Sequence, residues 1–275
     1  MLQPVLASLL PNLENLPGMY AADLSAFPEI VFFFLFLLGG CFGSFANAAA
    51  MRLVRDESPV LPPSRCRYCD TPLRWHDNLP LLGWLLLRGK SACCQKQLSV
   101  RYILVEWGFA MLTLWLALCL PLPVFAALTV VNIIMMIALL TDSESMVLHP
   151  LSLLIGAIFG MVFAVFIDGW PTSFTDSVAG AVCGGGVIFI VNLIYRLMRG
   201  TNGFGSGDIW LLGMIGAVFG LIPTIIIFFA SAMLGAVVGC ALILAKKAAS
   251  SSKLPFGLFL SVVFLLYPAL NMLLI

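Results

Sequence analysis

The stretch Gly203-Phe204-Gly205-Ser206-Gly207-Asp208 separates two long apolar segments and places an acidic residue at the edge of a membrane span. Glycine at every second position removes three side chains just before Asp208 and lets another chain approach the backbone closely. A carboxylate at a membrane boundary is costly unless it is paired, hydrated or functional. Aspartate is also a favoured cap at a helix N-terminus. Taken alone, the stretch leaves a helix cap and a functional site equally open.

Composition assigns the chain to the polytopic membrane proteins. Of its 275 residues, 61% are hydrophobic and 10% are charged, whereas soluble domains carry about 25% charged residues. Eight apolar segments approach the roughly 20 residues that a bilayer requires. They lie near 30–51, 102–120, 123–141, 148–167, 177–198, 208–222, 224–245 and 255–274. We therefore predict an all-α membrane protein with eight transmembrane helices.

One polar insertion interrupts this series and divides the chain. The predicted parts are a periplasmic N-terminal segment at 1–29, a first transmembrane helix at 30–51, a cytoplasmic cysteine-containing insertion at 52–101 and a seven-helix membrane domain at 102–275. Orientation follows from Lys and Arg, which accumulate in cytoplasmic loops. With eight spans, all 14 basic residues fall on one face. That face is predicted to be cytoplasmic, and both termini are then periplasmic.

The same orientation places two acid-bearing turns at the cytoplasmic boundary. One turn holds Asp142 and Glu144 after the third span, and the other holds Asp208 before the sixth. Two carboxylates that lie close together share a proton, so that one activates water while the other polarises a peptide carbonyl. This is the chemistry of an aspartic protease, and we expect the two carboxyls to share a water in a cavity open to the cytoplasm. Two unrelated helix caps, or the proton relay of a transporter, are the alternatives.

The order of several short blocks is similar to that of a known family. Gly205-Ser206-Gly207-Asp208 resembles the Gly-x-Gly-Asp motif of intramembrane aspartyl proteases, and the surrounding blocks resemble the type IV prepilin leader peptidase family. The blocks are Gly43-Ser44-Phe45-Ala46-Asn47 with Arg52, Pro63-Ser64-Arg65-Cys66-Arg67-Tyr68-Cys69, Asn78-Leu79-Pro80-Leu81-Leu82-Gly83-Trp84-Leu85, Arg101-Tyr102 with Val105-Glu106, Asp142 with Met146 and Leu148, and the glycine stretch with Asp208, followed by Pro255-Phe256-Gly257. The ordered set is far more specific than one Gly-x-Gly-Asp.

The resemblance implies two activities at the cytoplasmic face of a bacterial inner membrane. One removes a short basic leader from pilin-like precursors, and the other N-methylates the exposed amine with S-adenosylmethionine. It places Asp142 and Asp208 on the catalytic pair, with Glu144 as the alternative first acid, and Gly205 and Gly207 at the substrate. The implied partners are prepilins or pseudopilins and membrane lipid, without nucleic acid. An aspartyl peptidase that lacks methylation and, more remotely, a proton-coupled transporter are the alternatives.

Four cysteines in the insertion indicate a metal site. The Cys66-x-x-Cys69 spacing suits tetrahedral zinc, because one turn brings both thiolates to one ion, and a reducing compartment disfavours a disulfide. The family commonly has a second Cys-x-x-Cys, which in this chain would use positions 91 and 94, but position 91 is a serine. The predicted structural zinc ligands are Cys66, Cys69 and Cys94, with Cys93 or His76 as the fourth. Buried thiols without a metal are the alternative.

Glu106 is the remaining acid near the cytoplasmic end of a span. It could pair with Arg101 or Arg52, or it could serve the methyl transfer. No Gly-x-Gly-x-x-Gly nucleotide fingerprint is present in the sequence. The prediction of an S-adenosylmethionine cofactor therefore depends on the resemblance, which assigns no residues to it.

Overall fold

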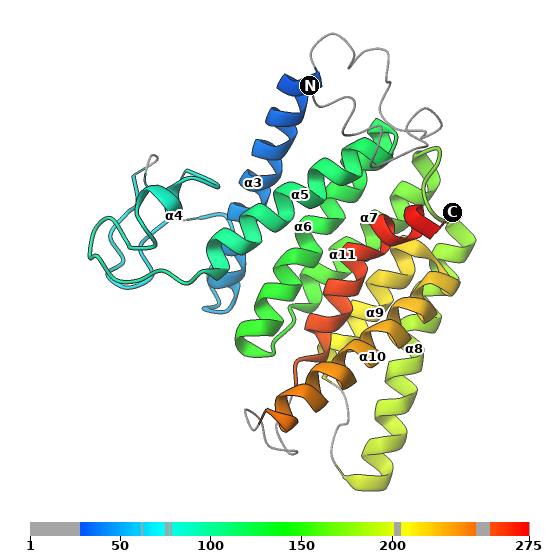
Figure 1. Cartoon of the computed structure of the whole chain (residues 1–275). Coiled ribbons are helices and arrows are strands. Elements are labelled where there is room, and N and C mark those ends of the chain that lie inside the picture. The colour runs from blue at the N-terminus through cyan, green and yellow to red at the C-terminus, as the bar shows by residue number, and fades with distance from the viewer. Residues whose placement is uncertain are drawn as a thin grey trace.

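The computed structural model describes residues 28–61, 63–74, 77, 79–200, 205–245 and 254–274 (Figure 1). Helices account for most of this part, and its β-structure is confined to two isolated bridges in the insertion. The helices are α3 (Pro28–Leu53), α4 (Gly83–Leu86), α5 (Arg101–Cys119), α6 (Leu122–Ser145), α7 (Pro150–Phe166), α8 (Phe174–Arg199), α9 (Ser206–Phe219), α10 (Leu221–Leu244) and α11 (Phe256–Leu274). The all-α prediction is confirmed, and every predicted apolar segment coincides with one of these helices. The predicted periplasmic segment lies almost wholly outside the described residues.

Five of the described helices are long and apolar enough to cross a membrane, and they are the first span within α3, followed by α5, α6, α8 and α10. Helices α7 and α9 and the segment Phe256–Pro268 of α11 are also apolar but shorter, and α9 is only 14 residues long. A helix rises about 1.5 Å per residue, so 14 residues fall short of the roughly 30 Å hydrocarbon core. The count of eight crossings therefore stays a prediction.

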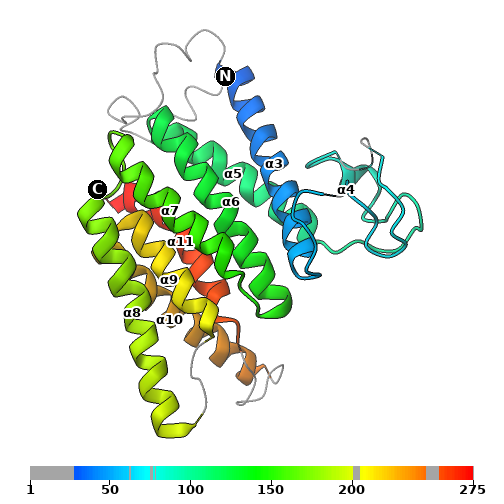
Figure 2. The same cartoon turned by 180° about the vertical axis from the view of Figure 1, so that it is seen from behind.

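The helices form two groups on either side of α6. Helix α3 packs along α5, and the cysteine-containing insertion lies beyond them (Figures 1 and 2). On the other side, α9 packs against α7, α8, α10 and α11. Helix α6 touches α3, α7 and α11 and is mostly buried, as expected for a helix that is apolar all round. The turn that carries Asp142 therefore ends the central helix α6, and the turn that carries Asp208 begins α9 in the second group.

Glycines fix the position of α9 against α8. A Cβ atom on Gly184 would lie only 2.7 Å from the backbone oxygen of Leu212, and one on Gly185 would lie 3.2 Å from that of Ile209. Small residues allow this close approach of helix backbones in a membrane. Gly184 and Gly185 therefore allow α9 to lie directly against α8. Because α9 is held along its length, its first turn, which carries Asp208, has a defined place.

Candidate functional site

Asp142 lies in the last turn of α6 and is bound by the start of α11. Helix α6 ends because Met146 adopts a left-handed conformation with φ of 53°, while its N–H still bonds to the Asp142 backbone oxygen. The Asp142 side chain accepts a hydrogen bond of 2.7 Å from the Leu258 N–H. Backbone N–H groups at a helix N-terminus lack helical partners and carry partial positive charge. The α11 terminus therefore both orients this carboxylate and stabilises negative charge on it.

Gly257 makes this arrangement possible. A Cβ atom at position 257 would lie 2.9 Å from Asp142 Oδ2 and 3.0 Å from Leu148 Cδ1, closer than real side chains pack. The Pro255-Phe256-Gly257 block thus brings α11 onto the acid. The sequence singled out this block only as a match, because a backbone N–H such as that of Leu258 leaves no side-chain signal.

Asp208 lies in the first turn of α9 and caps that helix. Its Oδ2 accepts a hydrogen bond of 3.1 Å from the Gly205 N–H. The glycine stretch and Asp208 therefore do form a helix cap. A capping bond leaves the carboxylate further lone pairs, so it does not exclude a catalytic role. Gly203, at the start of the stretch, lies outside the described residues.

The two acids converge around Leu148. A Cβ atom on Gly207, next to Asp208, would lie 2.5 Å from Leu148 Cβ, and the same side chain reaches Gly257 beside Asp142. The carboxylates of Asp142 and Asp208 are close enough to repel each other electrostatically. Their residues are only 4% and 8% exposed, so the open cavity and the shared water stay predictions. The close approach at Gly207 is made by Leu148 of this chain, and contact with a substrate stays a prediction.

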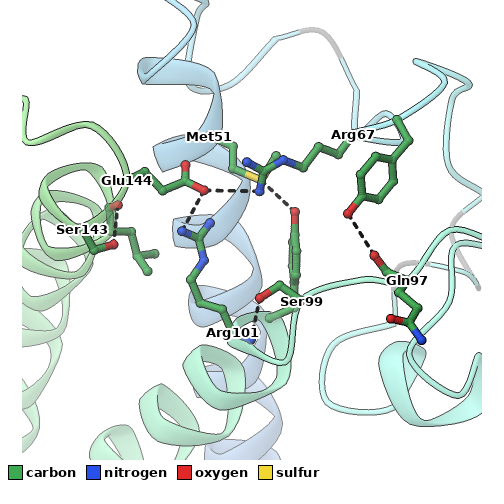
Figure 3. A network of polar contacts seen from close by, with 10 residues as sticks. Met51, Arg67, Gln97, Ser99, Arg101, Ser143 and Glu144 are labelled. Atoms are coloured by element: carbon green, nitrogen blue, oxygen red, sulfur yellow. Dashed lines mark hydrogen bonds and ion pairs between the residues drawn. The ribbon is translucent and has the colours of Figure 1, made fainter. Parts of the chain in front are cut away.

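Glu144, two residues after Asp142, joins three parts of the chain. Its Oε1 forms ion pairs with Arg67 of the insertion, at 3.2 Å, and with Arg101 at the start of α5, at 2.9 Å (Figure 3). Arg67 lies between Cys66 and Cys69 in the sequence. Glu144 therefore ties the cysteine turn to the end of α6, and the geometry favours Asp142 as the first acid.

Glu106 has a different set of partners from those expected. Its Oε2 accepts a hydrogen bond of 2.8 Å from the Leu81 N–H, and its carboxylate lies near the Ser44 side chain of α3. The expected arginine partners are wrong, because Arg101 pairs with Glu144 and Arg52 donates to the Pro59 carbonyl oxygen at 2.9 Å. Glu106 thus joins α5 to α3 and to the insertion.

The insertion contains two turns of the same construction. In the first, an isolated bridge joins residues 65 and 72, and in the second an equivalent bridge joins residues 90 and 97. The Cys66 N–H bonds to the residue 71 oxygen, just as the Ser91 N–H bonds to the residue 96 oxygen, each at 2.9 Å. Asp70 lies four residues after Cys66 and Gln95 lies four residues after Ser91, and both have positive φ, of 52° and 57°. Ser91 therefore occupies the position that Cys66 has in the first turn.

The four thiols of the insertion form one cluster. The sulfur atoms of Cys66, Cys69, Cys93 and Cys94 all lie within 4.8 Å of one another, and the Cys66–Cys94 and Cys69–Cys93 separations are 3.7 and 3.2 Å. Zinc–sulfur bonds of about 2.3 Å in a tetrahedron place sulfur atoms about 3.8 Å apart. The four thiols, with Cys93 in the fourth place, could therefore hold a zinc ion. His76, the other candidate, lies outside the described residues.

The Ser91 hydroxyl lies between two of these thiols. It is 3.2 Å from Cys66 Sγ and 3.1 Å from Cys93 Sγ. Burial acts to raise the pKa of the Cys66 thiol, but hydrogen bonds from Ser91 and from backbone N–H groups outweigh it and lower this pKa to about 6. The thiolate is the form that binds metals. Ser91 thus supports the cluster as a hydrogen-bond donor instead of as a ligand.

Family models match both halves of the chain. Residues 37–120 match the bacterial peptidase A24 N-terminal domain, and residues 129–240 match the type IV leader peptidase family. The first match spans α3, the insertion and α5, and the second spans the helices that carry both aspartates. No solved structure gives a significant match.

Curated relatives share most of their length with this chain. A prepilin leader peptidase/N-methyltransferase of Aeromonas hydrophila is 31% identical over 261 residues, which cover 86% of this chain and 89% of the relative. The protein of the same name from Stutzerimonas stutzeri is 35% identical, covering 74% of this chain and 70% of the relative. That of Klebsiella pneumoniae is 32% identical, with coverage of 77% and 93%.

Proposed function

The chain belongs to the type IV leader peptidase family, and we propose that it cleaves the leader from pilin-like precursors and N-methylates the new N-terminus. The resemblance of the sequence blocks to this family is thereby confirmed. The observation that carries the proposal is the convergence of Asp142 and Asp208 from the ends of α6 and α9. In the proposed reaction, one carboxylate takes a proton from the attacking water, and the protonated partner polarises the scissile carbonyl.

The site would act on a peptide at the membrane surface. Both acids lie at helix ends, in the last turn of α6 and the first turn of α9, where an anchored substrate exposes its cleavage point. The proposed location is a bacterial inner membrane, with the site facing the cytoplasm and with prepilins or pseudopilins as substrates. A proton-coupled transporter would need acids that are reachable from both faces. The two acids of this chain share one end of the bundle, which favours the peptidase.

The cysteine cluster is proposed to hold structural zinc on Cys66, Cys69, Cys93 and Cys94. A structural zinc site contributes its binding free energy to folding, and the described residues of the insertion form little regular structure. The methyl donor is proposed to be S-adenosylmethionine, as the names of the relatives suggest. When bound, this cofactor supplies an electrophilic methyl group.

The full chain, purified in detergent, tests the proposed function with a pilin-type precursor as substrate. Mass spectrometry of the product separates the two activities, because leader removal and the addition of one methyl group change the mass by different amounts. We expect both changes when S-adenosylmethionine is present and leader removal alone without it. An intact precursor in both samples would contradict the proposed leader cleavage. A cleaved product that is never methylated would support the alternative of a peptidase that lacks methyltransferase activity.

Gly257→Ala is expected to reduce leader cleavage at least tenfold. The new Cβ would lie 2.9 Å from Asp142 Oδ2, so that either the carboxylate or α11 must move, and a misplacement of about 1 Å can cost about 100-fold in rate. Gly108→Ala in α5 is the matched control, because a Cβ there meets no atom within 4 Å. Cleavage rates of both variants in detergent check the prediction, and equal rates would contradict it.

Glu144→Gln is expected to retain most of the cleavage activity but to loosen the insertion. The substitution removes the charge that pairs with Arg67 and Arg101 and leaves the aspartate pair unchanged. Hydrogen exchange of the segment around Arg67 should therefore accelerate relative to the native protein. Unchanged exchange there, or a loss of cleavage as large as that caused by substituting Asp142, would contradict this division of roles.

A further inference from the structure

Three sequence blocks that the peptidase does not use meet at one cavity of about 580 Å³. Ser44 comes from the first block, Trp84 from the block of residues 78–85, and Glu106 from the start of α5. The cavity lies between α3, α5 and the insertion, and none of its described lining residues belongs to α6–α11. Its volume falls within the roughly 300–1,000 Å³ that small-molecule and cofactor sites occupy. The cavity is therefore a second site, separate from the aspartate pair.

A strained turn at Leu81 lies beside this cavity, which the flanking residues Leu79 and Gly83 line. Leu81 is buried and has a left-handed φ of 67°, which is unfavourable for leucine and persists only where neighbours enforce it. Its N–H donates a hydrogen bond to Glu106. Its side chain packs directly against Gly40, because a Cβ atom on Gly40 would lie only 2.6 Å from Leu81 Cγ. Strain of this kind clusters at binding sites. The turn leads directly into α4, which carries Trp84.

Trp84 offers an aromatic surface and an unused donor. Its indole Nε1 is buried and has no hydrogen-bond partner within the part of the chain that the structure describes. Gly89 approaches the indole so closely that a Cβ there would lie 2.8 Å from Trp84 Cζ2. Buried indole N–H groups normally have an acceptor. A flat heterocycle with ring nitrogen acceptors would supply both the stacking surface and the missing acceptor.

The lining offers both signs of charge to one ligand. Its basic side chains are Arg52, Arg55, Arg65 and Arg67, and its acidic ones are Glu57, Asp70, Asp77 and Glu106. Guanidinium groups bind a carboxylate, whereas carboxylates bind cations and hydroxyl groups. Glu106 is buried between α3 and α5, and Gly43 allows this because a Cβ there would lie 2.9 Å from the Glu106 Cα. Glu106 thus provides negative charge where the cavity meets the two membrane helices.

We propose that this cavity binds S-adenosylmethionine, with the adenine at Trp84 and the sulfonium toward Glu106. The inference rests on the proposed N-methyltransferase function and assigns it a site. A heterocycle, a carboxylate, two hydroxyls and two cationic groups in one ligand match the aromatic, basic and acidic lining. The sulfonium faces the membrane helices because the acceptor amine belongs to a membrane-anchored chain. The Arg67–Glu144 ion pair of 3.2 Å joins the cavity lining to the end of α6, so both sites adjoin one substrate terminus.

The charge change during transfer gives the proposal a specific signature. The amine, after losing a proton to solvent, forms a bond to the methyl carbon while the carbon–sulfur bond breaks and leaves its electron pair on sulfur. The cofactor thereby changes from a sulfonium cation to the neutral thioether S-adenosylhomocysteine. A carboxylate beside the sulfur stabilises the cation and not the product. Glu106 should therefore make the protein bind S-adenosylmethionine more tightly than S-adenosylhomocysteine.

Equilibrium binding of both compounds to the full chain in detergent, measured by calorimetry, tests the proposal without relying on catalysis. Trp84→Phe keeps the ring but removes the donor, and we expect it to weaken S-adenosylhomocysteine binding about tenfold. Glu106→Gln can still accept the Leu81 hydrogen bond, and we expect it to weaken S-adenosylmethionine about tenfold more than S-adenosylhomocysteine. Trp107→Phe and Arg88→Gln are matched controls, because Trp107 and Arg88 are exposed and lie outside the cavity lining. Leader cleavage at the native rate verifies that each variant is folded.

The outcomes separate this inference from the proposed function. Native affinity of both folded variants, in a protein that still methylates, would overturn the inference and leave the function intact. A wild-type protein that neither binds nor methylates would overturn the methyltransferase itself, and with it the inference. Loss of binding by the two controls as well would overturn the assignment to this cavity. Retention of anionic phospholipid in place of either cofactor form would assign the arginine-rich lining to a lipid headgroup and overturn the proposal.

Discussion

Asp142→Asn and Asp208→Asn are each expected to abolish leader cleavage while the protein stays folded. Asparagine keeps the size of aspartate and can accept the hydrogen bonds from Leu258 and Gly205, but it cannot take up or release the catalytic proton. Loss of a general acid or base costs about 10² to 10⁴ in rate, and a pair that shares a proton should lose at least as much. Cleavage of a pilin-type precursor in detergent, followed over several orders of magnitude, checks the prediction.

Two comparisons make this result specific to the pair. Glu144→Gln removes an acid only two residues from Asp142, and its cleavage rate should stay near that of the native protein. Methylation of a substrate that is already cleaved should survive in both aspartate variants, because methyl transfer needs no carboxylate pair. Near-normal cleavage by Asp208→Asn would end the aspartyl-protease interpretation and leave the glycine stretch as a helix cap alone.

The helices and the aspartate pair were predictable from the sequence for physical reasons. A membrane span must satisfy its own backbone hydrogen bonds, so apolar length identifies helices, and the eight predicted segments coincide with helices of the structure. The two acids were predictable because carboxylates at the ends of apolar segments are rare unless they are functional. Their convergence around Leu148 depends on the packing of α6, α9 and α11, which no local pattern encodes.

The remaining partners escaped prediction because backbone groups and distant residues provide them. The bond from Leu258 to Asp142 uses a backbone N–H, which every residue except proline possesses. An arginine was one of the partners considered for Glu106, but a strained turn at Leu81 presents a backbone N–H to it instead. For the fourth thiol the sequence left Cys93 and His76 open, and the fold of the insertion brings Cys93 into the cluster.

Cys93→Ser and Cys69→Ser are each expected to remove stoichiometric zinc and destabilise the insertion. In zinc-finger peptides the metal contributes about 10–16 kcal/mol of apparent folding free energy, and the insertion consists mainly of turns around this cluster. Cys183→Ser is the matched control, because Cys183 is an exposed cysteine within α8. Ser91→Ala removes only a hydrogen-bond donor and should keep the metal. Metal content of the purified proteins, measured by elemental analysis, checks all four variants.

The same cysteine variants should damage methylation more than cleavage, because the structure gives the insertion unequal access to the two sites. It forms most of the wall of the cavity beside Trp84, including Cys66 of the cluster and Ser91 beside it. Its described ion pair with the peptidase helices is that of Arg67 with Glu144 at the end of α6, beyond Asp142. Cleavage should therefore fall about as far as in Glu144→Gln, while methylation is lost. Equal loss of both activities would mean that the insertion also positions the aspartate pair, and retention of methylation without metal would contradict the structural role of zinc.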